Sequence, residues 1–514
     1  MLLGLVMIFL TTNDREFCDS VKRLMFSNPF SAERLQRERE LLGDRFDEHD
    51  TAWQGRGDTS KPRANVLAIG QLICQHAQSL RAKLREHESG NICGEDRQRY
   101  QRLILSWLFL SFEERFFTPI VERPDEESAA NQKRYAAIWV DFLREGSSWL
   151  PPQVIEKPVV DILSRWFALC FQVRRAFHHV FRRLTGYSKP MDELRQAIWE
   201  SIFTHDMERY DQLFHDQMRV FSTLILGETG TGKELAAEAI ARSAYIPFDP
   251  ISMTFRADFY ESFLPVNISA MPDSLVESEL FGHAEGAFTD AKKKRTGIFG
   301  QCSEWGSVFL DEIGELNTDL QVKLLRVLQN REFRPVGDDR PQRFKGRLIA
   351  ATNADIVRAV QEEKFREDLL YRLCSDTIRM PSFRDQIRDS PEELLRAVTW
   401  VLRDGLRWPE AELSESARKI TSQLNETLGL QHEWRGNFRE LEQHVRSAVL
   451  HEVVKPFIAP KRMSTRDWID DLRDGSLSNA ELLKHYHSLV LRKFEGNKTA
   501  AAKALGINKQ TLKC

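Results

Sequence analysis

The chain has few cysteines and no long apolar segment, and these two features disfavour a disulfide-rich protein and a membrane-spanning protein. Its seven cysteines are odd in number and form no C-x-x-C pair, which favours reduced thiols over a disulfide framework. Cys74 and His76 match no zinc-binding spacing. The opening MLLGLVMIFL is about half as long as a membrane span and lacks a basic start or a cleavage site. We therefore expect a cytoplasmic protein without a membrane partner, in which this opening forms a buried strand or helix.

An excess of charge of one sign is also absent. The 514 residues carry 73 basic and 76 acidic side chains, a formal net charge of -3, which disfavours a protein coated in positive charge. A local exception is residues 476–514, with seven Lys or Arg against two acids. The length exceeds what one hydrophobic core supports, so we expect about two to four domains, one of them a small basic module.

Residues 1–188 carry helical patterns. In the segments 64–87 and 159–186, apolar residues recur at intervals of three and four, which is typical of amphipathic helices. Glycine and proline gather only at breaks such as QGRGDTSKP. No doubly wound pattern with an acidic phosphorylation pocket occurs here, which disfavours a phosphorelay receiver. We predict a mostly helical N-terminal regulatory domain of unknown type.

A phosphate-binding loop follows the first strong strand signal. The run FSTLILGETGTGKELAAEAIA reads as strand, glycine loop and alanine-rich helix, the order of a P-loop fold. Glycines let successive N–H groups face one centre at the helix N-terminus, and Lys233 is placed to reach the β- and γ-phosphates. Glu234 stands where a Ser or Thr usually contacts magnesium, so the ion must depend on another acid. The predicted nucleotide site comprises Gly227, Glu228, Thr229, Gly230, Thr231, Gly232, Lys233 and Glu234.

Two further apolar runs, GSVFLDE and GRLIAATN, end in polar residues. Buried strands with polar carboxyl ends predict a parallel α/β sheet that carries its site at those ends. We expect Asp311 to hold Mg²⁺ directly or through water, and Glu312 to orient and polarise the attacking water. Asn353 is expected to sense the γ-phosphate. Positive charge for phosphoryl transfer is offered by Arg366, Arg372 and Arg439, either within one subunit or across to a neighbour.

Six blocks together resemble a known family in order and spacing. The blocks are GETGTGKE, ESELFGHAEGAFTDA, GSVFLDEIGEL, LQVKLLRVLQNREFRPVG, FREDLLYRL and WRGNFREL. With these blocks the chain resembles the AAA+ domain of bacterial enhancer-binding proteins, the activators of sigma-54 RNA polymerase. The resemblance implies a three-layer AAA+ α/β ATPase subdomain over 189–385 and a helical lid over 386–456. It further implies a homo-oligomeric, hexameric ring with ATP at the subunit interfaces.

The resemblance also implies roles for individual residues. Glu234 is usual in this family after the P-loop lysine. Asp311 and Glu312 become the Walker B acids, and Arg366 and Arg372 the arginine pair that acts on the neighbouring subunit. The remaining implied roles are a first sensor at Thr352 and Asn353, a second sensor at Arg439, and an asparagine, Asn267, that restrains the catalytic glutamate.

The block GAFTDA resembles the loop with which this family touches sigma-54 in step with the γ-phosphate state. Phe288 is suited to bury against a partner and Thr289 to hydrogen-bond, on a small, movable tip. Asp290 stands where the family has glycine and adds charge to the contact surface. The predicted contact residues are Gly286, Ala287, Phe288, Thr289, Asp290 and Ala291.

The C-terminal residues 476–514, after a linker over 457–475, resemble a Fis-type helix-turn-helix. Asn508 is expected to cap a recognition helix whose first residues, Lys509, Gln510 and Thr511, face base edges. Lys498, Lys503 and Lys513 are expected to contact phosphates. An ordinary helical hairpin is the alternative. The chain ends at Cys514, about two turns into that helix, which leaves a truncated chain or weak DNA binding open.

Together these patterns predict an ATP- and Mg²⁺-dependent transcriptional activator. It would bind double-stranded upstream DNA and remodel the closed complex of sigma-54 RNA polymerase. Two alternatives remain open from the residues alone: an AAA+ ATPase that remodels another protein, and a DNA-binding repressor with a vestigial ATPase.

Overall fold

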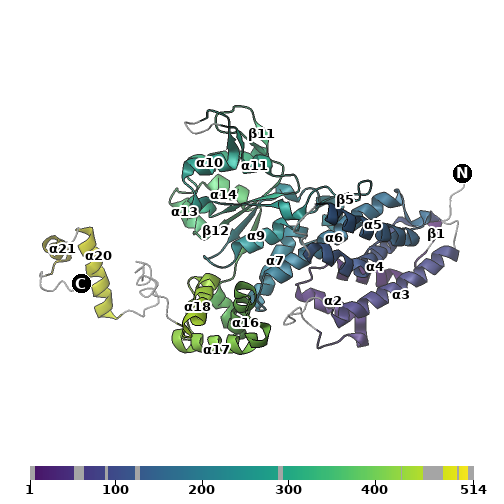
Figure 1. Cartoon of the computed structure of the whole chain (residues 1–514), viewed down its shortest axis with the longest axis horizontal. Coiled ribbons are helices and arrows are strands. Elements are labelled where there is room, and N and C mark those ends of the chain that lie inside the picture. Colours follow the sequence, from purple (N-terminus) through teal and green to yellow (C-terminus); the bar gives the residue numbers. More distant parts are fainter. Residues whose placement is uncertain are drawn as a thin grey trace. The chain divides into compact units, whose positions relative to one another are not determined.

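The structure is a computed structural model of the 514-residue chain. It describes residues 6–7, 9–50, 63–86, 91–121, 128–287, 293–429, 431–454, 478–494 and 497–507. The chain divides into two compact units, Met1–Lys455 and Pro456–Cys514 (Figure 1). Within the described residues, no helix combines the length and the apolar character needed to cross a membrane.

The N-terminal region is helical, as its sequence periodicity predicts. The first helix begins with a reciprocal cap: the Thr11 hydroxyl accepts from the Asp14 N–H at 3.2 Å, and the Asp14 carboxylate accepts from the Thr11 N–H at 3.0 Å. A short parallel pair, β1 (Val6–Met7) with β2 (Asn91–Ile92), lies among the helices. The helices are α1 (Thr12–Met25), α2 (Ala32–Leu42), α3 (Ala64–Glu86), α4 (Gly94–Val121), α5 (Ser128–Trp149), α6 (Val159–Arg183), α7 (Lys189–Phe203) and α8 (Met207–Arg209).

A five-stranded parallel sheet forms the centre of the first unit. Its strand order is β13-β3-β12-β9-β6, so the strand before the phosphate loop, β3, lies between β13 and β12. The strands are β3 (Thr223–Leu226), β6 (Phe263–Asn267), β9 (Ser307–Asp311), β12 (Arg347–Thr352) and β13 (Asp376–Arg379). Because all of them run in one direction, their polar carboxyl ends meet at one edge of the sheet.

Alternating side chains of the strands point into two different cores, which gives three layers. One face, with Ile225, Phe309 and Ile349, packs on α9 (Lys233–Ala241) and the N-terminal helices. The other face, with Leu224, Val308 and Leu348, packs on a second helical layer. That layer consists of α10 (Asp273–Phe281), α11 (Ile298–Gln301), α12 (Thr318–Asn330), α13 (Ile356–Gln361) and α14 (Glu367–Leu373).

Three small hairpins and a helical lid complete the unit. The hairpins are β4 (Phe248–Asp249) with β5 (Thr254–Phe255), β7 (Gly282–His283) with β8 (Arg295–Thr296), and β10 (Glu332–Phe333) with β11 (Gln342–Arg343). The lid has its own core around Phe383, Leu402 and Trp434. Its helices are α15 (Phe383–Asp389), α16 (Glu392–Trp400), α17 (Glu410–Leu428) and α18 (Asn437–His451).

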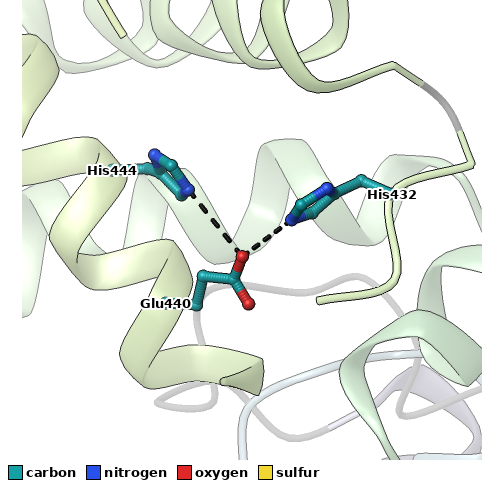
Figure 2. Close-up of side chains that lie close together, drawn as sticks. All are labelled: His432, Glu440 and His444. Atoms are coloured by element: carbon teal, nitrogen blue, oxygen red, sulfur yellow. Dashed lines mark hydrogen bonds and ion pairs between the residues drawn. The ribbon is translucent and has the colours of Figure 1, made fainter. Parts of the chain in front are cut away.

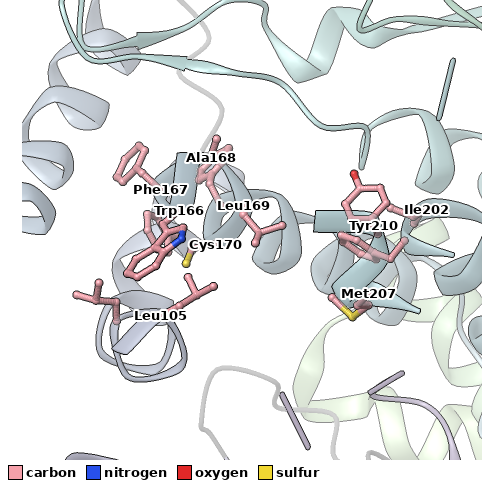
Figure 3. Packing of buried hydrophobic residues seen from close by; sticks show 14 of the residues in the cluster. Leu105, Trp166, Phe167, Ala168, Leu169, Cys170, Ile202, Met207 and Tyr210 are labelled. Atoms are coloured by element: carbon pink, nitrogen blue, oxygen red, sulfur yellow. The ribbon is translucent and has the colours of Figure 1, made fainter. Parts of the chain in front are cut away.

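The N-terminal helices and the ATPase sheet share one hydrophobic core. Figure 3 shows part of it, with Phe167 and its neighbours on α6 and with Ile202 at the end of α7. The ring of Phe167 lies 4.5 Å from that of Phe248 on β4. Gln172, also on α6, donates to the carbonyl of Ser243 just beyond α9, at 2.9 Å. The helix that carries Lys233 at one end is thus fixed to the N-terminal helices at the other.

The second unit contains the described helices α20 (Asn479–Lys493) and α21 (Lys498–Leu505). Asn497 caps α21 by accepting from the N–H groups of Thr499 and Ala500, both at 3.2 Å. Ala501 and Ala502 are buried between the two helices, and their small side chains allow close packing. Gly506 ends α21 in the left-handed conformation, φ +65°, as a glycine turn requires.

Candidate functional site

The phosphate loop lies between β3 and α9, with its glycines where the backbone demands them. Gly230 and Gly232 have φ of +79° and +89°. A Cβ on Gly230 would come within 2.3 Å of the carbonyl oxygen of Gly436 in the lid. Lys233 opens α9 and is buried, and its Nζ donates to the carbonyl of Gly227 at 3.0 Å. Glu234 is exposed on the first turn of α9.

The two acids at the end of β9 face this loop. Glu312 has a left-handed backbone, φ +56° and ψ +50°, which costs a non-glycine residue about 1 kcal/mol or more. Its carboxylate lies 3.6 Å from Lys233 Nζ and accepts from the N–H of Asn353 at 3.0 Å. The unusual backbone therefore aims the carboxylate at the phosphate loop instead of continuing the strand.

The environment of Asp311 suits a divalent cation. Burial raises the pKa of Asp311, and the neighbouring charge of Glu312 raises it further, while Lys233 and Arg439 act in the opposite direction. Two adjacent carboxylates are oxygen donors of the kind that Mg²⁺ prefers, and a bound cation would relieve their mutual repulsion. The residues present therefore fit a magnesium ion, with Asp311 as its protein ligand.

The end of β12 is also joined to the phosphate loop. The side-chain amide of Asn353 donates to the hydroxyl of Thr229 at 2.8 Å. The carbonyl of Thr352 accepts from the N–H of Gly227 at 3.3 Å. The predicted first sensor thus contacts both the loop and, through the Asn353 N–H, the carboxylate of Glu312.

The lid is fastened to the loop by residues that the motif analysis did not select. Asn437, fully buried with φ +50°, donates to the Glu228 carboxylate at 3.1 Å and to the Thr229 carbonyl at 3.0 Å. Its side-chain oxygen Oδ1 accepts from the Phe383 N–H at 2.7 Å. Arg384 forms an ion pair with Glu228. The only sequence signal for this junction was the WRGN block itself.

The predicted arginines differ in position. The charge of Arg439, on α18, acts on Asp311 in the same chain. The Arg366 guanidinium pairs with Asp368 at 2.8 and 3.0 Å, and Arg372 is exposed on α14. Among the described residues, neither Arg366 nor Arg372 forms a hydrogen bond or ion pair with the phosphate loop. Their action on a neighbouring subunit stays a prediction.

Asn267 lies at the end of β6, paired in register with Asp311. Its side-chain oxygen accepts from the Ser269 hydroxyl at 2.8 Å. In this structure the Glu312 carboxylate is held by the Asn353 N–H and Lys233, so the predicted restraint by Asn267 stays a prediction.

The stem of the GAFTDA loop is a short hairpin of β7 and β8. The His283 ring bridges it: Nε2 donates to the Lys293 carbonyl at 3.1 Å, which leaves Nδ1 to accept from the Ser278 hydroxyl at 2.7 Å. Gly286 has φ +78° with open space around it, and the Ala287 N–H donates to the Ala284 carbonyl at 3.3 Å. Phe288, Thr289, Asp290 and Ala291 lie outside the described residues.

A cavity of about 260 Å³ lies between residues 185–187 and the lid. Phe438 lines it and also donates its N–H to the Gly230 carbonyl at 3.1 Å. Its other walls include Thr185, Gly186, Tyr187, Glu393 and Arg396. A separate cavity of about 290 Å³ lies near Ser307 and Arg347, at the amino ends of the strands and away from the loop.

The predicted DNA-contacting residues are only partly described. Lys498 and Lys503 are exposed on α21. Asn508, Lys509, Gln510, Thr511 and Lys513 lie outside the described residues, so the predicted recognition helix stays a prediction.

Four features define an AAA+ P-loop fold, as predicted. They are the sheet order, the phosphate loop at the end of β3, the two acids at the end of β9 and the docked helical lid. Residues 201–379 match the Sigma-54 interaction domain family. The chain is thus a relative of the sigma-54-dependent transcriptional activators, which confirms the resemblance carried by the six blocks.

Two curated relatives illustrate the match. The Nif-specific regulatory protein of Azotobacter vinelandii is 41% identical over 271 residues, covering 51% of this chain and 48% of that protein. The transcriptional regulatory protein ZraR of Escherichia coli is 37% identical over 296 residues, covering 57% and 62%. The chain thus spans about half to three fifths of their length. A crystal structure of NtrX from Brucella abortus in complex with ATP aligns over 70% of this chain and 76% of that chain, with 22% identity and a TM-score of 0.39.

Proposed function

We propose that the chain is an ATP-hydrolysing activator of sigma-54 RNA polymerase. The main support for ATP hydrolysis is the position of Glu312. Its carboxylate lies between Lys233 of the phosphate loop and the Asn353 N–H, at the common edge of the sheet. This is where a water attacking a γ-phosphate would have to be oriented. The family match to residues 201–379 supports sigma-54 as the partner.

The residues divide the hydrolytic chemistry between them. Loop N–H groups and Lys233 neutralise the phosphates, and the nucleotide base enters the cavity beside Phe438 and Tyr187. Asp311 would hold Mg²⁺, which supplies charge neutralisation on the phosphate oxygens. Glu312 orients the attacking water and takes its proton. For this Glu312 must release the Lys233 and Asn353 contacts, and that release is the step by which the nucleotide state alters the end of β12.

The GAFTDA loop would transmit the nucleotide state to the protein partner. Its stem follows α10, and the Ala284 N–H donates to the Val336 carbonyl at 2.9 Å, so the stem is tied to the turn of the β10–β11 hairpin. We propose that residues 286–291 contact sigma-54, that Arg366 and Arg372 act across the interfaces of a hexameric ring, and that residues 476–514 bind double-stranded upstream DNA. The cytoplasmic location of the protein belongs to the same proposal.

In vitro transcription from a sigma-54 promoter tests this function. With wild-type protein, open complexes should require ATP, and Lys233→Ala should abolish both nucleotide binding and opening. Asp290→Gly, which removes a charge from the contact surface, should open the promoter at least as well as wild type at unchanged ATP turnover. If ATP turnover is normal and neither protein opens the promoter, sigma-54 is not the partner.

One specific residue favours a second candidate, an AAA+ ATPase that remodels a different protein. Asp290 adds charge at the predicted contact surface. Capture of sigma-54 in the presence of a transition-state phosphate analogue separates the two. A complex with sigma-54 supports the activator, and its absence at normal ATPase activity supports the other partner. The residual third candidate, a repressor with a vestigial ATPase, is removed by any measured ATP turnover above background.

A further inference from the structure

Three side chains of the lid, from α18 and the segment before it, converge on one another (Figure 2). Glu440 and His444 lie one turn apart on α18, and His432 approaches them from the segment before that helix. Nε2 of His432 lies 2.7 Å from Oε1 of Glu440, and Nε2 of His444 lies 3.9 Å from the same oxygen. All three ligand-type atoms are within 4.8 Å of one another.

One of these groups is buried without a hydrogen bond. The His444 side chain is 2% exposed, and within the described part of the chain its Nε2 has no hydrogen-bond partner. Leaving a buried imidazole nitrogen unsatisfied costs about 1–3 kcal/mol. Figure 2 shows this nitrogen directed at Glu440, and a cation between them would satisfy it.

The Glu440 carboxylate is already anchored by a backbone donor. Burial by itself would raise the pKa of Glu440, but the nearby His444 side chain, the Gly436 N–H and His432 together outweigh burial and lower the pKa to about 2. Oε2 accepts from the Gly436 N–H at 2.8 Å, which leaves Oε1 facing both imidazoles. The cluster therefore offers two imidazole nitrogens and one carboxylate oxygen whose position is fixed by the Gly436 N–H.

We propose that His432, Glu440 and His444 bind one Zn²⁺ ion, with water at the fourth position. Two histidines and a glutamate form a known donor set for zinc. Metal–ligand distances of about 2.0–2.1 Å place tetrahedral ligands about 3.3 Å apart. The contacts of 2.7 and 3.9 Å therefore each need to change by only about 0.6 Å. Mg²⁺ is not expected, because it prefers oxygen ligands.

The position of this site gives the ion a structural consequence. Glu440 accepts a hydrogen bond from the Gly436 N–H. The two residues that follow Gly436 contact the phosphate loop: Asn437 donates to Glu228 and Thr229. Phe438 donates to Gly230. A zinc ion would fix residues 432–440 in the arrangement that docks on the phosphate loop. This inference does not depend on sigma-54 as a partner.

Zinc titration of the full-length, chelator-treated protein tests the site. Isothermal calorimetry should show one Zn²⁺ per chain, and Co²⁺ in its place should give the intense visible absorption of a tetrahedral ion. His432→Gln and His444→Gln should each weaken zinc binding at least tenfold. The matched control His451→Gln, an exposed histidine at the end of α18, should bind as wild type. Asp311→Asn, which changes a carboxylate at the end of β9 and outside the cluster, should also bind zinc as wild type does.

No zinc uptake by the wild type, or equally tight uptake by both cluster variants, overturns the site. Limited trypsin digestion then tests its consequence, because Arg435 is exposed within residues 432–440. Zinc should slow cleavage after Arg435 at least threefold in wild type and leave the rate unchanged in His444→Gln. Equal rates with and without zinc in the wild type would overturn the proposed fixing of this segment. Circular dichroism of each variant without metal checks its folding.

Discussion

At the scale of single residues, Glu312 combines a left-handed backbone with the proposed role of catalytic base. Glu312→Gln keeps the side-chain size and the acceptor for the Asn353 N–H but removes the negative charge that orients and deprotonates water. We expect ATP binding within about threefold of wild type and hydrolysis reduced by about 10²–10⁴. Fluorescent-nucleotide titration and phosphate release measure the two quantities. Normal hydrolysis by this variant would exclude Glu312 as the catalytic base.

The lowered pKa of Glu440 predicts a pH dependence of stability. Its pKa is about 2 in the fold against an ordinary value of 4.5, so its stabilising effect is present above about pH 4.5 and disappears as pH falls towards 2. In chelator, Glu440→Gln should lower the free energy of unfolding at pH 6 by at most about 3 kcal/mol, and by less at pH 3.5. Urea unfolding at both values checks this.

Residues with local signals were predictable, and residues paired over long distances were not. Lys233 and the acids Asp311 and Glu312 lie just after strands, and both the strand and the polar residues can be recognised from neighbouring positions in the sequence. Glu228 was predicted to belong to the nucleotide site, but its contacts with the lid were not predicted, because its partners Arg384 and Asn437 lie more than 150 residues away. No spacing rule connects residues that far apart.

At the scale of elements, the lid and the phosphate loop form one junction. Asn437→Ala removes donors to Glu228 and Thr229 and places a Cβ-bearing residue without a polar side chain at φ +50°. We expect nucleotide affinity to fall at least tenfold and the melting temperature to drop by several degrees. Asn425→Ala on α17 is the matched control. If Asn437→Ala bound nucleotide as tightly as wild type, the junction would not contribute to the nucleotide site.

Strands and helices of the ATPase region were predictable because each carries its own periodicity. The runs GSVFLDE and GRLIAATN became β9 and β12, and the glycine loop lies between β3 and α9. The strand order was not predictable from periodicity, because it depends on which buried faces pack together. The lid cluster of His432, Glu440 and His444 had only a weak signal, the four-residue spacing of its last two members.

At the scale of the whole first unit, the N-terminal helices and the ATPase share a continuous core. Separate hydrophobic cores would allow separate melting, whereas a shared core favours one cooperative transition. We expect residues 1–188 and 189–385 to unfold together in calorimetry of the full chain. Tryptophan fluorescence and far-UV circular dichroism should give coincident transitions for this unit. Two resolved transitions that map to the two regions would show that the shared core does not couple them.

The attachment of α6 beside the end of α9 makes α9 a lever. The helix has nine residues, about 13 Å in length, with Lys233 at one end and the Gln172–Ser243 contact just past the other. A helix this short is stiff, so a displacement imposed at one end is delivered to the opposite end almost undiminished. A compound that displaced α6 from Ser243 would therefore shift Lys233 and change the affinity for the phosphates, although it would bind far from the nucleotide.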